Sequence, residues 1–244
     1  MKNSNGAFHF KEGEVLLIDK PLEWTSFDVV NKIRGTITRK AGIRGIKVGH
    51  AGTLDPLATG LLILCTGKFT KRISEMMGLE KEYTGTMMLG STTPSFDLET
   101  EIDEKYPTDH LTQEAVYEAV FDFIGDIEQV PPLFSAIKVK GNRAYHFARN
   151  SEKVNLSPRN VTIETFELTR IAIPEVDFRV VCSKGTYIRS LVRDFGKKLN
   201  SGAHLTSLRR TRIGKFSIDH AITPMQFEKM LENFSPEVNE DREL

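Results

Sequence analysis

The chain has 244 residues, which is long enough to bury a full core in one large domain or in one domain with a small appendage. Its 33 Lys and Arg residues are balanced by 33 Asp and Glu residues, and this zero net charge excludes a generic basic binding protein. No apolar run approaches the roughly 20 residues that span a bilayer, and the first residues lack the apolar stretch of a signal peptide. We therefore expect a cytoplasmic protein with no membrane partner.

The first part of the chain predicts a strand, a helix and a second strand. Residues 15–18 suit a strand. A helix is expected over residues 26–37, with Ser26 as a possible N-cap and Asp28 in the first turn. Its buried face comprises Val30, Ile33 and Ile37. Residues 61–65 form a continuous apolar run that is typical of a buried strand.

Between this helix and this strand lies the segment GHAGTLDPLATG, residues 49–60. Its glycines allow sharp bends and the close approach of a ligand, and its one acid is Asp55. Between Asp28 and Asp55 there is no acid but there are six bases: Lys32, Arg34, Arg39, Lys40, Arg44 and Lys47. An aspartate in such a basic segment indicates chemistry on nucleic acid, although an Asp-Pro pair taken alone more often marks a turn.

The second part of the chain predicts strands at residues 83–89, 161–173 and 176–181 and a helix at residues 112–124. The inward face of this helix comprises Val116, Ala119, Val120 and Phe123. Because strands and helices alternate irregularly, we expect an α+β fold with a mixed, largely antiparallel sheet flanked by helices. We expect one catalytic domain over residues 1–234 and an acidic, disordered tail over residues 235–244.

The clearest helical pattern covers residues 186–199. Its apolar stripe comprises Ile188, Leu191, Val192, Phe195 and Leu199. Beside it we expect a basic stripe of Arg189, Arg193 and Lys197 that can contact phosphate. The two cysteines, Cys65 and Cys182, lie in strand-like apolar segments and are expected to be buried free thiols.

Charges are segregated along the chain. Residues 97–128 contain eleven acids and one base, whereas residues 179–215 contain ten bases and one acid. The segment of residues 138–160 mixes bases with aromatic side chains, which suits RNA but also suits a surface hairpin with a short helix. The residues concerned are Lys138, Lys140, Arg143, His146, Arg149 and Lys153 with Tyr145 and Phe147. A solvated surface is the alternative interpretation for any one of these segments.

Together these segments resemble the TruB family of pseudouridine synthases, which make pseudouridine at position 55 in the T loop of tRNA. The resemblance is strongest in GHAGTLDPLATG around Asp55, and it extends over most of the chain in the family's order. The other matching segments are LLIDKP (16–21), KEYTGTMMLG (81–90), CSKGTYIRSL (182–191) and GAHLTSLRRTRIG (202–214).

The resemblance implies a pseudouridine synthase core with RNA-binding loops, including a T-arm-binding insertion near residues 138–160. Asp55 is then the catalytic aspartate, directed at the ribose of a flipped-out nucleotide, where it stabilises positive charge, attacks the anomeric carbon or removes a proton. By the same resemblance Arg189 pairs with Asp55 and Tyr83 stacks on the target base. His50 and Tyr187 lie near the flipped nucleotide, Leu208 lies under the uracil, and Lys20 supports the loop or touches phosphate.

The implied partner is the T-arm stem-loop of tRNA, with no guide RNA and no obligate protein partner, because only about thirty residues follow the core where many relatives carry a PUA domain. No zinc motif, P-loop or dinucleotide fingerprint is present, so we expect no metal and no cofactor. Two rival functions remain: a non-catalytic tRNA-folding chaperone that uses the same groove, and a nucleoside hydrolase.

Overall fold

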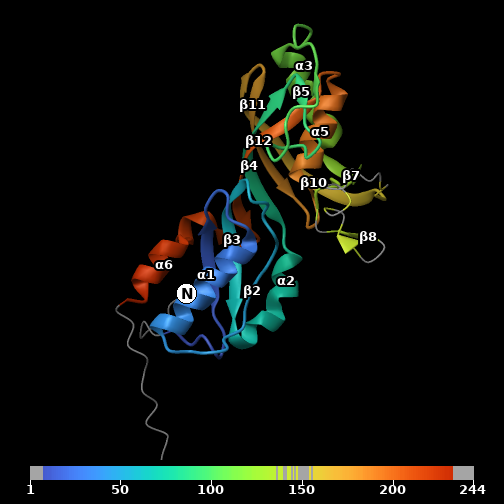
Figure 1. The fold of residues 1–244 in the computed structure, drawn as a ribbon. Helices are drawn as coiled ribbons and strands as arrows, with labels where there is room; N and C mark the ends of the chain where they lie inside the picture. Colours follow the sequence, from blue (N-terminus) through green and yellow to red (C-terminus); the bar gives the residue numbers. More distant parts are fainter. Residues whose placement is uncertain are drawn as a thin grey trace, which may run out of the picture. The chain divides into compact units, whose positions relative to one another are not determined.

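The computed structural model describes residues 8–135, 137–139, 142–143, 145, 147, 154 and 156–232 (Figure 1). The chain divides into two compact units. Unit 1 comprises Met1–Leu79 and Arg210–Leu244, and unit 2 comprises Glu80–Arg209. Strand β12 (Ala203–Ile213) begins in unit 2 and ends in unit 1. No helix in the described part of the chain is long and apolar enough to cross a membrane.

Unit 1 is built on strand β3, which is buried at every position except Thr59. Strands β1 and β2 both pair antiparallel with β3. The predicted strands at residues 15–18 and 61–65 are thus confirmed. In chain order the elements of unit 1, besides the end of β12, are β1 (Val15–Lys20), α1 (Ser26–Lys40), β2 (Val48–His50), β3 (Ala58–Thr66), η1 (Gly67–Arg72), α2 (Ile73–Met77), β13 (Phe216–Ser217), η3 (Ile218–His220) and α6 (Pro224–Met230).

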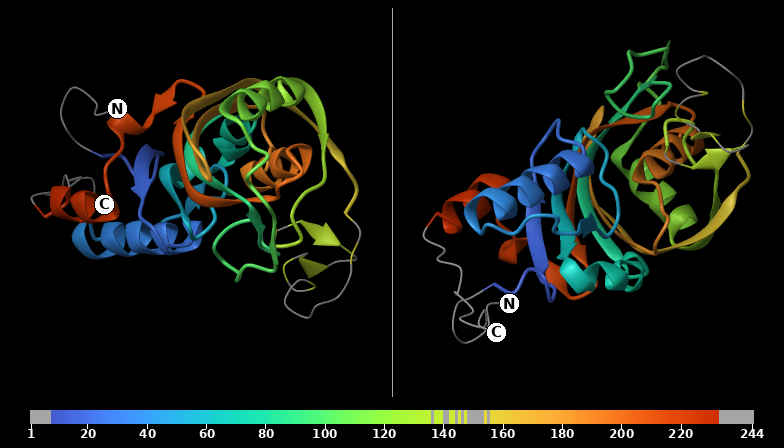
Figure 2. Two further views of the ribbon diagram at one scale, coloured as in Figure 1. Left: turned by 90° about the horizontal axis from the view of Figure 1, so that it is seen from above. Right: turned by 60° about the horizontal axis from the view of Figure 1, so that its bottom comes forward.

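Alternation along β3 supplies both faces of the sheet in unit 1. Leu62 and Leu64 pack with Val29 and Ile33 of α1 and with Phe227 of α6. The intervening residues of β3 pack on the opposite face with Met76 of α2 and Ile213 of β12. Helices α1 and α6 therefore lie together over one face of the sheet, as the two views in Figure 2 show.

The start of α1 differs by one residue from the sequence prediction. Thr25, rather than Ser26, is the N-cap, and it forms a capping box with Asp28. Both residue types cap helices well, so the sequence did not separate them. Ser26 is the first residue of the helix, and its buried hydroxyl binds the backbone of Leu54 instead.

Unit 2 contains a sheet with the strand order β12, β4, β11, β10 and β7. The pairs β4–β11, β11–β10 and β10–β7 are all antiparallel. The predicted largely antiparallel sheet flanked by helices is confirmed. In chain order the elements of unit 2, besides the start of β12, are β4 (Lys81–Leu89), β5 (Ser91–Thr92), β6 (Glu104–Lys105), α3 (Gln113–Glu118), η2 (Ala119–Phe123), β7 (Gly125–Gln129), β8 (Lys138–Val139), β9 (Asn142–Arg143), β10 (Arg159–Ala172), β11 (Glu175–Cys182) and α5 (Ile188–Lys198).

Aromatic side chains join the helices of unit 2 to its sheet. Phe195 of α5 packs against Phe166 of β10, with ring centroids 5.4 Å apart, and against Phe123 of η2 at 5.8 Å. The predicted helix at residues 112–124 is in fact an α-helix followed by a 3-10 helix, although all four predicted inward residues are buried. Both cysteines are buried free thiols, as predicted, and burial raises the pKa of Cys182 to about 12.

The predicted T-arm-binding insertion is described only in part. Strands β8 and β9 form a two-stranded ladder within it, and Tyr145 and Phe147 are described as well. Four of the predicted RNA-contacting bases lie outside the described residues: Lys140, His146, Arg149 and Lys153. The predicted tail, residues 235–244, also lies outside them.

Candidate active site

Asp55 lies half-buried in the loop between β2 and β3, in unit 1. The backbone bends at Gly52 in this loop and again at Gly60, near the start of β3; their φ angles are +97° and +103°. A Cβ atom on Gly60 would lie 2.3 Å from the carbonyl oxygen of Arg210. Only glycine therefore allows the backbone of β12 to pass so close to the end of this loop.

The buried guanidinium of Arg210 binds three backbone carbonyls, two in the loop and one in β3. Its Nη2 donates to the carbonyl of Gly52 at 3.0 Å, its Nη1 to that of Thr53 at 3.4 Å, and its Nε to that of Leu61 at 2.8 Å. The side chain is 1% exposed, so it contacts the protein interior rather than solvent. The guanidinium is a rigid fork of donors and is suited to binding several carbonyls at once.

Ser26 holds the peptide group on the N-terminal side of Asp55. Its Oγ accepts a hydrogen bond from the N–H of Leu54 at 2.9 Å and donates to the carbonyl of Leu54 at 3.2 Å. The hydroxyl is buried, and it binds both the N–H and the carbonyl of Leu54. Helix α1 thus positions the loop through its first residue.

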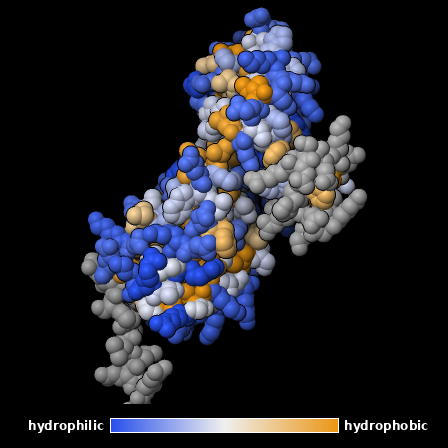
Figure 3. Space-filling view, viewed as in Figure 1, coloured by the Kyte–Doolittle hydropathy of each residue, from blue (hydrophilic) through white to orange (hydrophobic). Residues whose placement is uncertain are grey.

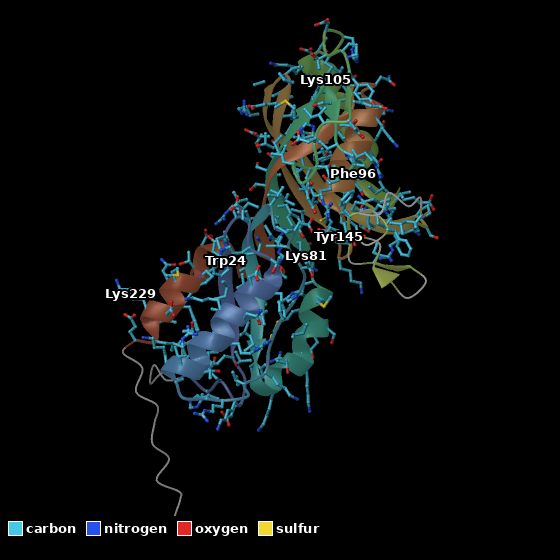
Figure 4. The ribbon with its side chains drawn as sticks, viewed as in Figure 1. Trp24, Lys81, Phe96, Lys105, Tyr145 and Lys229 are labelled. Atoms are coloured by element: carbon cyan, nitrogen blue, oxygen red, sulfur yellow. The ribbon has the colours of Figure 1, made fainter. Side chains whose placement is uncertain are left out.

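Lys20, at the end of β1, binds the carbonyl of Pro56, the residue that follows Asp55. Its Nζ donates to the carbonyls of Pro56 at 3.2 Å, Trp24 at 2.6 Å and Pro21 at 2.9 Å; Trp24 is labelled in Figure 4. Burial lowers the pKa of Lys20 to about 8, while the negative charge of Asp55 acts in the opposite direction. Because Lys20 has no exposed surface, it can support the loop but cannot touch phosphate.

His50 ends β2, a few residues before Asp55. Burial and the nearby positive charge of Arg210 lower the pKa of His50, which keeps the imidazole neutral at pH 7. Its Nδ1 is buried and has no hydrogen-bond partner among the described residues.

The remaining predicted site residues lie in unit 2. Tyr83 is a buried residue of β4, opposite Val180 of β11. Tyr187 is the N-cap residue of α5, and its N–H donates to the side-chain oxygen of Gln129 at 2.8 Å. Leu208 is a half-buried residue of β12.

Arg189 is buried in unit 2, with 3% of its surface exposed. Its Nη1 donates to the carbonyl of Ser95 at 3.0 Å and its Nη2 to that of Phe134 at 2.8 Å. Its Nε lies 3.5 Å from a carboxylate oxygen of Asp97, which is itself buried. Arg189 therefore ties two loops of unit 2 to the start of α5.

The predicted basic stripe on α5 is wrong as a phosphate-binding surface. Only Lys197 of its three residues is exposed. Arg193 pairs with Asp194, donates to the carbonyl of Val130 at 3.2 Å and lies 4.7 Å from the ring centroid of Phe96, which is labelled in Figure 4. Helical periodicity placed these bases on one face, but it could not show that loops of the same unit cover that face.

The acid-free run of bases around α1 is also less positive than its sequence suggests. Glu228 of α6 contacts Lys32 at 2.5 Å and Arg39 at 3.1 Å, and Glu232 lies 4.0 Å from Lys40. The surface over α1 and α6 is largely hydrophilic in Figure 3. Acids distant in sequence thus neutralise part of this surface.

Three of the predicted residues, Asp55, His50 and Lys20, lie in unit 1, and the charges of Asp55 and Lys20 act on each other. Sequence reasoning did not identify Ser26 and Arg210, which hold the loop of Asp55 in unit 1, or Asp97, which faces Arg189 within unit 2. The family-like segment 202–214 contains Arg209, Arg210 and Arg212. Nothing in the local sequence indicates which of these three arginines binds the loop. Within the described residues, no group of three or more His, Cys, Asp or Glu side chains is arranged to hold a metal ion.

Comparisons with known proteins agree over nearly the whole chain. Residues 38–188 match the family model "TruB family pseudouridylate synthase (N terminal domain)", and residues 189–243 match that of the tRNA pseudouridylate synthase B C-terminal domain. The tRNA pseudouridine synthase B of Flavobacterium johnsoniae is 58% identical over 224 residues, which cover 91% of this chain and 98% of that protein. The protein of the same name from Phocaeicola vulgatus is 59% identical, with 92% and 95% covered.

Solved structures show the same fold at lower identity. A crystal structure of a Cbf5-Nop10-Gar1 complex matches with a TM-score of 0.65 and 30% identity over 88% of this chain. The structure of an H/ACA RNP bound to a substrate RNA containing 2'-deoxyuridine matches with a TM-score of 0.64 and 27% identity over 91% of this chain. This chain spans about half of each of those chains, 52% and 54% respectively.

Proposed function

The chain belongs to the TruB family of pseudouridylate synthases, and on this premise we propose that it acts on tRNA and converts the uridine at position 55 of the T loop to pseudouridine. The chain is an isomerase of this family. The tRNA substrate is supported by relatives named tRNA pseudouridine synthase B, which share more than half of their residues with this chain. The position in the T loop rests on the resemblance of residues 49–60 to the family signature.

In this proposal Asp55 is the catalytic residue. Isomerisation breaks the bond between ribose and the base nitrogen, and positive charge develops on the ribose as that bond opens. A carboxylate beside the ribose stabilises that charge, attacks the anomeric carbon or removes a ribose proton. The single observation that carries the assignment is the fixed, half-exposed loop in which Asp55 is the one acid.

Four other predicted residues bind the nucleotide in this proposal. Tyr83 stacks on the flipped-out uracil, Leu208 lies beneath it, and His50 and Tyr187 contact the nucleotide or its surroundings. The pairing of Arg189 with Asp55 that the family resemblance implies stays a prediction, as does activity without a guide RNA or a protein partner. Uracil stays bound through the reaction, so no second carboxylate is needed to activate water.

The test is the position of pseudouridine in a tRNA transcript incubated with the purified protein alone. We expect modification at position 55 and nowhere else, in the T-arm stem-loop as in the full tRNA. Free uracil in place of pseudouridine would identify a hydrolase. Tight tRNA binding without either product would identify a chaperone, and both outcomes would overturn the proposal.

A further inference from the structure

The residues on both sides of Asp55, Leu54 and Pro56, are held by side chains from outside the loop. Ser26 binds both backbone groups of Leu54, and Lys20 binds the carbonyl of Pro56, to which the N–H of Glu23 also donates at 2.9 Å. Arg210 binds the carbonyls of Gly52 and Thr53. The backbone is therefore restrained from residue 52 to residue 56, although a glycine-rich loop would otherwise be mobile.

Ser26 does not cap helix α1. The N-cap of α1 is Thr25, which receives the N–H of Asp28 and completes a capping box. The hydroxyl of Ser26, the first residue of α1, instead binds both backbone groups of Leu54, 28 residues away in sequence. Its position therefore serves the loop.

Arg210 is an equally specific restraint. A buried guanidinium is costly to desolvate unless its donors are satisfied, and here three of them donate to carbonyls, two in the loop and one in β3. A lysine would keep the charge but could not reach all three carbonyls with the geometry of the planar fork. Because Gly60 has no Cβ, the backbone of Arg210 lies close to it, and the Arg210 side chain can bind the carbonyls of Gly52 and Thr53.

We propose that Ser26 and Arg210 are positioning residues, which fix the backbone of residues 52–56 so that the Asp55 carboxylate is held at the ribose. This role rests on the proposed function of Asp55. Catalytic groups act within narrow limits of position, and a displacement of about 1 Å can lower a rate by roughly a hundredfold. The restraints lie beneath the loop, in the interior of unit 1, and leave RNA binding to other residues.

The test compares Ser26→Ala with Thr36→Val. Thr36 is a fully buried residue of the same helix, and its hydroxyl has no hydrogen-bond partner among the described residues, so its loss removes a hydroxyl but no loop contact. With saturating T-arm RNA and well below the melting temperature, we expect Ser26→Ala to lower the single-turnover rate by about thirtyfold, with the Kd for RNA within about threefold of the wild type. Thr36→Val should keep the rate within about twofold.

Hydrogen exchange provides a second readout that does not depend on activity. Loss of the Ser26 acceptor should speed exchange of the Leu54 amide by about tenfold or more, whereas Thr36→Val should leave it unchanged. Arg210→Lys should lower the rate in the same way as Ser26→Ala, again with unchanged RNA affinity.

The outcomes separate this inference from the proposed function. If the wild-type protein makes pseudouridine but Ser26→Ala keeps its rate and its Leu54 protection, the positioning role is wrong. If the variant loses only melting temperature and not rate, Ser26 is structural and the role is again wrong. If the wild type makes no pseudouridine, the proposed function is overturned and the positioning role with it.

Discussion

Arg210 in unit 1 and Arg189 in unit 2 are both buried arginines that hold loops, but they are satisfied differently. Arg210 donates to three backbone carbonyls, whereas Arg189 donates to two and also faces the buried carboxylate of Asp97 at 3.5 Å. Carbonyls fix the shape of a loop without neutralising the charge. A buried carboxylate neutralises the charge, so that loss of this one acidic partner would leave the arginine buried and uncompensated.

The comparison shows that bases within a nucleic-acid enzyme need not be phosphate contacts. Both arginines lie in segments that the sequence marks as basic, and both are less than 5% exposed. The following variants test whether these buried arginines differ from the exposed bases around them, and whether they differ from each other.

Among the variants of this comparison, the largest effect is expected for Arg189→Met. We expect the single-turnover rate to fall by at least a thousandfold, about 4 kcal/mol. The family resemblance implies that Arg189 pairs with Asp55, and Arg189 also donates to the carbonyls of Ser95 and Phe134. Arg193→Met, four residues along the same helix, is the matched control and should lose less than about tenfold. Equal losses in the two variants would show that Arg189 has no special role.

Asp97→Asn sharpens the difference between the two arginines. It leaves Arg189 buried with no carboxylate from Asp97, so we expect the free energy of unfolding, measured with urea, to fall by about 3 kcal/mol. Asp194→Asn removes the carboxylate of a more exposed pair with Arg193 and should cost less than about 1 kcal/mol. If both variants lose the same small amount, the buried pair contributes no more than a surface pair does.

The third effect depends on pH and concerns Lys20, the other buried cation beneath Asp55. Its pKa is about 8 in the folded protein and 10.5 as its ordinary value, so the unfolded chain binds more protons between these pH values. The free energy of unfolding should therefore rise with pH, by about 2 kcal/mol between pH 8 and pH 10. Lys20→Met should abolish this rise relative to the wild type; an unchanged pH dependence would show that Lys20 titrates normally.

Much of the fold was predictable because it depends on local patterns. The apolar run of β3 predicted a buried strand, and the spacing of Val30, Ile33 and Ile37 predicted the buried face of α1. The motif around Asp55 predicted the loop itself. These features are set by residues that are close in sequence.

The contacts that hold the site depend on residues that are distant in sequence. Arg210 reaches the loop because β12 passes Gly60, and Ser26 reaches Leu54 because α1 begins beside the loop. Glu228 neutralises Lys32 and Arg39 across nearly two hundred residues. Periodicity identifies a face of a helix, but it does not identify what packs against that face.

In the proposed function, the carboxylate of Asp55, held in its loop, carries out the isomerisation. The most direct measurement is the single-turnover rate of pseudouridine formation in T-arm RNA by Asp55→Asn, beside its RNA affinity. The amide keeps the shape of the side chain but supplies no charge and accepts no proton, so we expect no pseudouridine with a Kd within about threefold of the wild type. Turnover by the Asn variant beyond what deamidation explains would contradict the account.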